Sequence, residues 1–189
     1  GRQVLSQPAF FAYVLQSGVI FSIFMVFVSI TPYIMSRLDR PASEFGLYYM
    51  LLAGGYFLGN MHVSRRAHAG NVERTTHLGL ALQLAAAVVG LGLVFGGLTH
   101  PIWIFGPMLP MAFGQGLAMP NLMARVLELA PGEAGVATSL LTFAQQIMAA
   151  FAVQAMGWAP TDSAVPLLLF CTAAALLAQV PTFGRPRAR

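Results

Sequence analysis

The sequence predicts an all-α integral membrane protein with six transmembrane helices. Hydrophobic residues make up 57% of the 189-residue chain and charged residues only 8%, and the mean hydropathy is +0.71. A hydrocarbon core of about 30 Å needs about 20 apolar residues of helix, because backbone polar groups inside it must be bonded within the segment. Six stretches close to this length fill the chain, which excludes a soluble domain.

Short polar connections separate the six predicted spans. Pro32 closes the first span, a basic segment with a helix-breaking Gly70 follows the second, and the turn before Pro101 is minimal. Such short connections make consecutive helices antiparallel neighbours in a bundle. The spans run roughly over residues 9–31, 45–61, 78–98, 102–126, 135–158 and 164–182.

The distribution of arginines predicts the orientation of the bundle. With alternating spans, Arg37 and Arg40 fall on one side of the membrane. The opposite side receives Arg2, Arg65, Arg66, Arg74, Arg125, Arg185, Arg187 and Arg189. The positive-inside rule then places both termini in the cytoplasm. The net charge of +4 is therefore interpreted as orientation signals and contacts with membrane lipids, and no nucleic-acid partner is expected.

The first span carries a polar cluster that is followed by aromatic rings. Tyr13 and Gln16 lie about one turn apart, and Phe24 follows two turns later. Rings and an amide together suit an amphipathic ligand. The second span has a comparable polar edge, formed by Tyr48, Tyr49, Tyr56 and Asn60, although Tyr48 and Tyr49 lie close enough to its end to belong to an interfacial aromatic belt instead.

The fourth span is the most irregular, and it is expected to be a kinked helix that can flex during gating. Its three helix-disrupting residues are Pro107, Pro110 and Pro120. Met108, Met111, Gln115, Met119 and Met123 follow one another at spacings of three, four, four and four residues and therefore share one helix face. Thioethers can repack around ligands of different shape, but methionine is also an ordinary filler of apolar helices, and both interpretations stay open.

The fifth span has one polar face. Thr138, Thr142, Gln145 and Ala149 recur at helical spacing, so this face is expected to avoid lipid. Two interpretations remain: hydrogen bonds between helices, each worth about 0.6 to 2 kcal/mol, or the wall of an aqueous substrate cavity. The third and sixth spans carry few polar side chains and are expected to face lipid.

No acid lies in the middle of any predicted span, so a proton-coupled carrier would need its buried carboxylate from sequence outside this chain. His62, His68 and His77 match no zinc pattern, and Cys171 is the single cysteine. No catalytic motif such as Gly-x-Ser-x-Gly occurs. We therefore expect no metal, no cofactor and no catalytic residue, and the chain is not predicted to be an enzyme.

Two runs of residues resemble a known family. They are GQGLAMPN over residues 114–121 and EAGVATSL over residues 133–140. Both are similar to the tenth-to-eleventh helix region of major facilitator superfamily drug:proton antiporters of the bicyclomycin and chloramphenicol resistance type. That resemblance implies a transporter of two six-helix bundles, of which residues 1–189 form the C-terminal half. The N-terminal half would be absent from a chain that opens Gly1-Arg2-Gln3 without methionine.

The same resemblance implies proton-coupled efflux of drugs or other small lipophilic compounds by alternating access, in the bacterial inner membrane. The first, second, fourth and fifth spans would line the central cavity. The proposed small-molecule substrate site consists of Tyr13, Gln16, Phe24, Met111, Gln115, Met119, Thr142 and Gln145. Arg65, Arg66 and Arg74 would close the cytoplasmic side, or merely orient the protein. The alternative function is a stand-alone six-helix channel or membrane scaffold acting as a homodimer.

Overall fold

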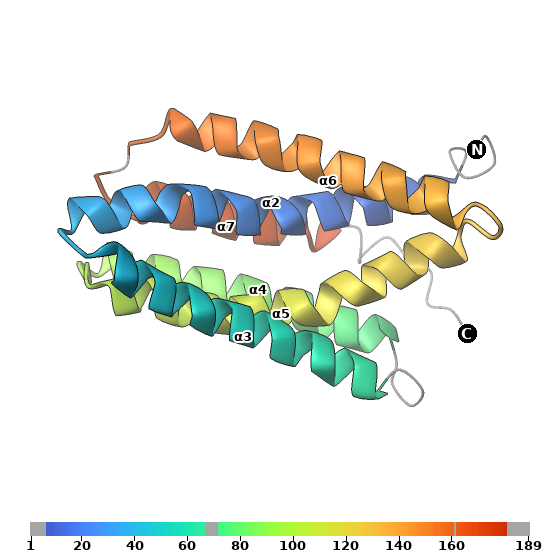
Figure 1. Cartoon of the computed structure of the whole chain (residues 1–189), viewed down its shortest axis with the longest axis horizontal. Coiled ribbons are helices and arrows are strands. Elements are labelled where there is room, and N and C mark those ends of the chain that lie inside the picture. The colour runs from blue at the N-terminus through green and yellow to red at the C-terminus, as the bar shows by residue number, and fades with distance from the viewer. Residues whose placement is uncertain (1–6, 67–71, 161, 181–189) are drawn as a thin grey trace.

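The computed structural model describes residues 7–66, 72–160 and 162–180, and all regular structure in these ranges is α-helical. The helices of these ranges run antiparallel to their neighbours in sequence (Figure 1). They are α2 (Pro8–Arg37), α3 (Ala42–Arg66), α4 (Val72–Phe95), α5 (Pro101–Glu128), α6 (Ala134–Gly157) and α7 (Val165–Leu177). The predicted all-α bundle is confirmed.

Several predicted boundaries were wrong, because hydropathy marks the apolar part of a helix and not its ends. The helix α2 continues to Arg37, five residues past Pro32, which lies inside it. A proline in a long helix frees a single carbonyl and need not end it. The helix α3 likewise extends through polar turns at both ends, and α4 begins at Val72, six residues before the predicted span.

Four described helices are long and apolar enough to cross a membrane, namely α2, α4, α5 and α6. The helix α7 is apolar but has only 13 residues. The helix α3 is long enough at 25 residues, but its tyrosines, its histidine and its terminal charges lower its hydropathy. The membrane-spanning character of the chain is therefore supported, while the six-span topology stays a prediction.

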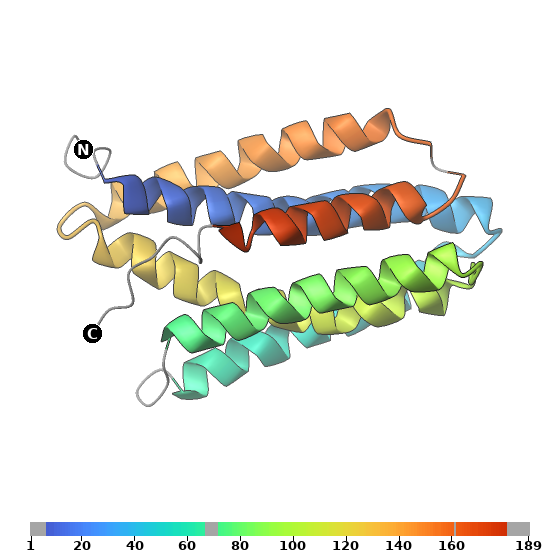
Figure 2. The same ribbon diagram turned by 180° about the vertical axis from the view of Figure 1, so that it is seen from behind.

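The helices pack in two groups of three. The helix α2 lies between α6 and α7, while α5 packs against both α3 and α4. Figure 1 and the reverse view in Figure 2 show these groups as separate layers. The largest apolar core joins the two groups through buried side chains such as Val26, Ala87, Phe105 and Leu168.

Glycines bring the backbone of α5 into direct contact with its two neighbours. Gly114 lies against Gly79 of α4, and a Cβ atom built on either residue would come within 2.5 Å of the other's carbonyl oxygen. On the opposite face, Gly116 lies against Gly59 of α3, where a Cβ atom on Gly59 would overlap the carbonyl oxygen of Phe113. In lipid, the hydrophobic effect does not drive helices together, because the lipid tails are as apolar as the side chains. Helices then associate through close backbone packing of this kind.

Side-chain amides connect the helices toward one end of the bundle. Gln16 of α2 donates a hydrogen bond from Nε2 to the carbonyl oxygen of Ala178 at 2.7 Å. Gln179 in turn donates from Nε2 to the carbonyl oxygen of Leu80 in α4 at 2.9 Å. These bonds link α2 to the C-terminal end of α7, and that end to α4, so both amides are structural contacts between helices.

The two ends of the bundle differ in charge, as the alternation of spans predicts. Arg37 pairs with Asp162 at one end, and Arg40 lies 3.8 Å from Glu44 at the same end. The opposite end carries Arg65, Arg66, Arg74 and Arg125 (Figure 1). Arg2, Arg185, Arg187 and Arg189 lie outside the described residues, and the side of the membrane that each end faces stays a prediction.

The contact between α3 and α5 predicts a difference between two glycines of the same helix. Gly59→Ala should lower the stability by about 1–3 kcal/mol, because the methyl group overlaps backbone atoms that cannot move aside. Gly54→Ala is the matched control, since nothing lies within 4 Å of its Cβ position. It should be neutral or should stabilise the helix by up to about 1 kcal/mol.

The measurement is thermal unfolding in detergent. Unfolding is monitored by a thiol-specific dye, which reacts with the buried Cys171 once the helices separate. Equal melting temperatures for the two variants would contradict the proposed role of the Gly59 contact.

Candidate functional site

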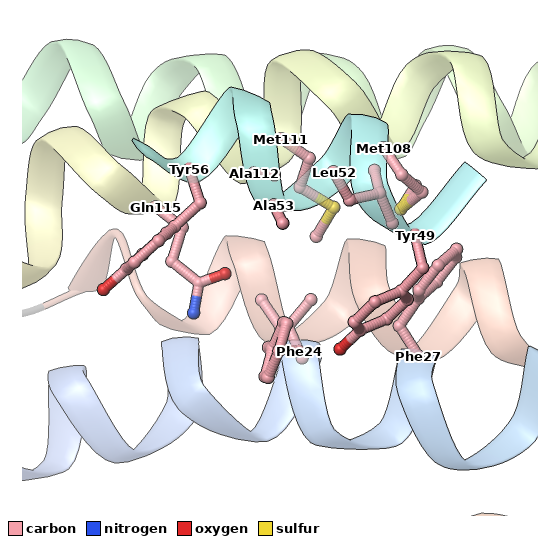
Figure 3. A pocket seen from close by; sticks show the side chains of 11 residues that line it. Phe24, Phe27, Tyr49, Leu52, Ala53, Tyr56, Met108, Met111, Ala112 and Gln115 are labelled. Carbon is pink, nitrogen blue, oxygen red and sulfur yellow. The ribbon is translucent and has the colours of Figure 1, made fainter. Parts of the chain in front are cut away.

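An apolar cavity of about 170 Å³ lies between α2, α3 and α5 (Figure 3). We call it the slot. Aromatic rings, thioethers and small aliphatic groups form most of its wall, and the side chain of Gln115 supplies an amide. It is lined by Ile23, Phe24, Phe27, Tyr49, Leu52, Ala53, Tyr56, Met108, Met111, Ala112 and Gln115.

A second hollow of about 340 Å³, the polar hollow, adjoins the slot at Tyr56, which lines both. It is lined by Ser17, Tyr56, Asn60, Met119, Pro120, Met123, Leu141 and Gln145. A third, open hollow of about 420 Å³ shares Asn60 and Pro120 with it. The three hollows therefore form a row that leads from the slot toward the arginine-rich end of α3, and α4 and α7 contribute no side chain to these three.

Aromatic rings pack around the end of the slot nearer the connection between α2 and α3. The rings of Tyr48 and Phe105 stack with centroids 4.5 Å apart, and Phe27 meets Phe105 edge to face at 5.4 Å. The ring centroid of Tyr49 lies 6.3 Å from that of Phe24, and Tyr49 lines the slot. Its ring therefore faces α2, while the interfacial belt suggested for Tyr48 and Tyr49 stays a prediction.

The close glycine contacts of α5 direct Gln115 into the slot. Gly114 faces α4 and Gly116 faces α3, so the residue between them points away from both of these contacts. Only 8% of Gln115 is exposed. In Figure 3 its amide lies beside Tyr56 and faces the space between α5 and α2.

Gln145 of α6 combines both roles that the sequence left open for the polar face of this helix. Its Nε2 atom donates a hydrogen bond to the hydroxyl oxygen of Ser17 in α2 at 3.2 Å, and the same side chain lines the polar hollow. The hydroxyl of Ser17 donates onward to the carbonyl oxygen of Val14 at 3.1 Å. A bond between helices thus forms part of the wall of the hollow.

The Major Facilitator Superfamily profile matches residues 1–153 of the chain. The chain belongs to the major facilitator superfamily. Members of this superfamily are transporters and not enzymes. Family membership and the apolar helices together indicate an integral membrane protein that takes part in transport. None of the curated proteins compared with the chain matches it.

The slot and the polar hollow, which we call the two inner hollows, are lined by five of the eight residues predicted to form the substrate site. Three are in the slot and two in the polar hollow: Phe24, Met111 and Gln115, then Met119 and Gln145. The hydrogen bond of Gln16 to Ala178 directs that amide toward α7. Tyr13 packs beside apolar side chains of α5 and α6. Thr142 is exposed on α6 and lines none of the three hollows.

Tyr56 and Asn60 of α3 line the hollows and belong to the polar edge that the sequence shows in the second span, although the proposed substrate site did not include them. Met108 lies on the predicted methionine face and lines the slot, and it too was left out of that site. Sequence reasoning missed the apolar lining residues Ile23, Phe27 and Leu52, because an apolar side chain in an apolar span carries no signal of its own.

The three prolines of the fourth predicted span all lie inside α5. The helix stays continuous over 28 residues, and its C-terminal half bends toward α6 (Figures 1 and 2). Pro120 also lines the polar hollow. The assignment of this bend to the three prolines and a role in gating stay predictions.

The arginines predicted to close the cytoplasmic side of the transporter lie away from the slot. Arg65 is exposed in the last turn of α3, and Arg74 lies in the first turn of α4. Within the described part of the chain, no three His, Cys, Asp or Glu side chains come together as a metal site. The gating role of the arginines stays a prediction.

The polar hollow predicts that Gln145 is reached by water. In membranes, Gln145→Cys should react with a water-soluble maleimide about tenfold or more faster than Phe151→Cys, because the reactive thiolate forms only where water is present. Phe151 lies on the same helix, and 74% of it is exposed to the surroundings of the bundle. The buried Cys171 gives a low background. Equal rates at the two positions would mean that no water-filled hollow exists at Gln145.

Proposed function

We propose that this chain is the C-terminal half of a proton-coupled exporter of drugs or other small lipophilic compounds. The observation that carries the proposal is the slot, in which a single buried amide, that of Gln115, faces aromatic and thioether walls. Small-molecule sites are typically apolar concavities with a few placed polar groups. Alternating access would expose this site to each side of the membrane in turn.

The exposed side chains of α6 support an N-terminal six-helix half as the partner. Thr142, Gln146 and Gln154 are exposed on this helix, and uncompensated amides are costly in hydrocarbon. A protein partner or a water-filled cavity removes this cost, whereas lipid does not. The second half of a two-bundle transporter would supply both.

The residue that exchanges protons would lie in the N-terminal half. In the part of the chain that the structure describes, no acidic side chain lines the slot or the polar hollow. A buried carboxylate is the usual carrier of a coupling proton. This half would therefore bind the substrate, while its partner would carry the proton.

We further propose that the protein lies in a bacterial inner membrane with both termini in the cytoplasm. The support is the gathering of Arg65, Arg66, Arg74 and Arg125 at one end of the bundle, which the positive-inside rule assigns to the cytoplasm. The row of hollows would then be open to the cytoplasm, the side from which an exporter takes its substrate.

The efflux proposal predicts that the complete transporter lowers the accumulation of a neutral lipophilic dye such as N-phenyl-1-naphthylamine in energised cells, and that an uncoupler abolishes the effect. Gln145→Ala should change the ratio of export between ethidium and a neutral dye such as N-phenyl-1-naphthylamine several-fold, because it removes a hydrogen-bonding group of about 1 kcal/mol from the hollow. Thr172→Ala on α7, outside the three hollows, should leave this ratio unchanged.

Accumulation that does not change in energised cells would count against efflux. Solute flux through this chain alone, assembled as a homodimer, would instead favour the stand-alone channel.

A further inference from the structure

We propose that Gln115 determines the substrate specificity of the slot by pairing with an uncharged hydrogen-bonding group that carries both a donor and an acceptor, such as a carboxamide attached to an aromatic ring. This inference rests on the proposed function, because it assumes that the slot holds the transported molecule. The inference adds the chemical class of that molecule and names the residue that recognises it.

The first step is the unpaired state of the Gln115 amide. Within the described ranges, neither its Nε2 nor its Oε1 atom has a hydrogen-bond partner, although only 8% of the residue is exposed. Gln16 and Gln179, by contrast, each donate to a carbonyl oxygen of another helix. Both atoms keep access to the slot, since neither is among the fully enclosed unpaired side-chain atoms of the described residues. A ligand with a complementary donor and acceptor would form hydrogen bonds with them, each worth about 0.5–1.5 kcal/mol.

A second buried amide helps to define what distinguishes Gln115. The Nε2 atom of Gln83 in α4 also has no partner, but this side chain packs against the backbone of α5 at Gly114 and lines none of the three hollows. A ligand in the slot therefore meets the amide of Gln115 and not that of Gln83.

The second step is the shape and chemistry of the slot walls. Phe24, Phe27 and Met111 offer faces that suit a flat apolar ring. An apolar cavity of about 150 Å³ is large enough for benzene, so the slot of about 170 Å³ has room for one aromatic ring. Larger substituents of the ligand would extend past Tyr56 into the polar hollow.

The third step is the absence of charge. Among the described residues, no Asp, Glu, Lys, Arg or His side chain lines the slot or the polar hollow. A cation that entered the slot would lose its hydration without meeting an opposite charge, which is unfavourable at membrane depth. An uncharged ligand avoids this cost, so the slot favours neutral molecules over cations of the same size.

The test measures binding of three probes to the complete transporter in nanodiscs by fluorine NMR of the ligand. The probes are 4-fluorobenzamide, 4-fluoroacetophenone, in which a methyl group replaces the amide nitrogen, and the 4-fluorobenzyltrimethylammonium cation. The wild-type protein should bind the benzamide about tenfold more tightly than the acetophenone, as one or two well-placed hydrogen bonds allow.

Gln115→Met should reduce this preference to within about twofold, because the thioether keeps the volume but loses the donor and the acceptor. The variant should also melt at a temperature equal to or above that of the wild type, since it loses no hydrogen bond within the described part of the protein. Gln115→Glu should instead bind the cation about tenfold more tightly than the wild type does. Gln83→Met, which also removes a buried amide but lines none of the three hollows, should retain the wild-type preference.

An unchanged preference in Gln115→Met would overturn the inference, and so would a wild-type protein that binds neither neutral probe. Partition of the probes into lipid is the same for all variants and cancels in the comparison. Export of dyes in the accumulation assay, together with an unchanged preference in Gln115→Met, would show that the inference has failed while the proposed function stands.

Discussion

The structure depends on the contact between the backbone of α5 and the backbones of its two neighbours. Between helices in lipid, hydrophobic attraction contributes little, and association relies on close packing and on hydrogen bonds. The pairs Gly79–Gly114 and Gly59–Gly116 provide the packing, and they lie on opposite faces of one helix. Fixing two faces also fixes the rotation of α5 about its axis, which is why Gln115 points into the slot.

The contacts that hold the bundle together differ along its length. Toward the arginine-rich end, directional hydrogen bonds join helices, as from Gln16 to Ala178 and from Gln145 to Ser17. Toward the opposite end, beyond the slot, the helices are joined by contacts between aromatic rings, such as the stacking of Tyr48 on Phe105. Hydrogen bonds specify one geometry, whereas aromatic and thioether contacts tolerate sliding and repacking. The slot therefore lies where the bundle can adapt to a ligand at the least cost.

Much of the fold follows from the sequence, because apolar length alone locates the helices. Their ends do not follow, since helical backbone continues past Pro32 in α2 and through the charged last turn of α3. Helical periodicity placed Met111 and Gln115 correctly on one face of the slot. It could not place Gln16, because the carbonyl group that takes up its amide, that of Ala178, lies 162 positions away in the sequence. Periodicity identifies a face but not the neighbour that the face meets.

The neutrality of the two inner hollows bears on how transport would be coupled. Their linings contain no acidic or basic side chain, so with a neutral substrate this chain would carry no change of charge through the transport cycle. Under the proposed function, the charge that moves with the proton would belong to the other half. Coupling would then require that the occupancy of the slot alters the contact between the halves. The exposed face of α6, which carries Gln146 and is joined to α2 through Gln145 and Ser17, is the surface through which that influence would pass.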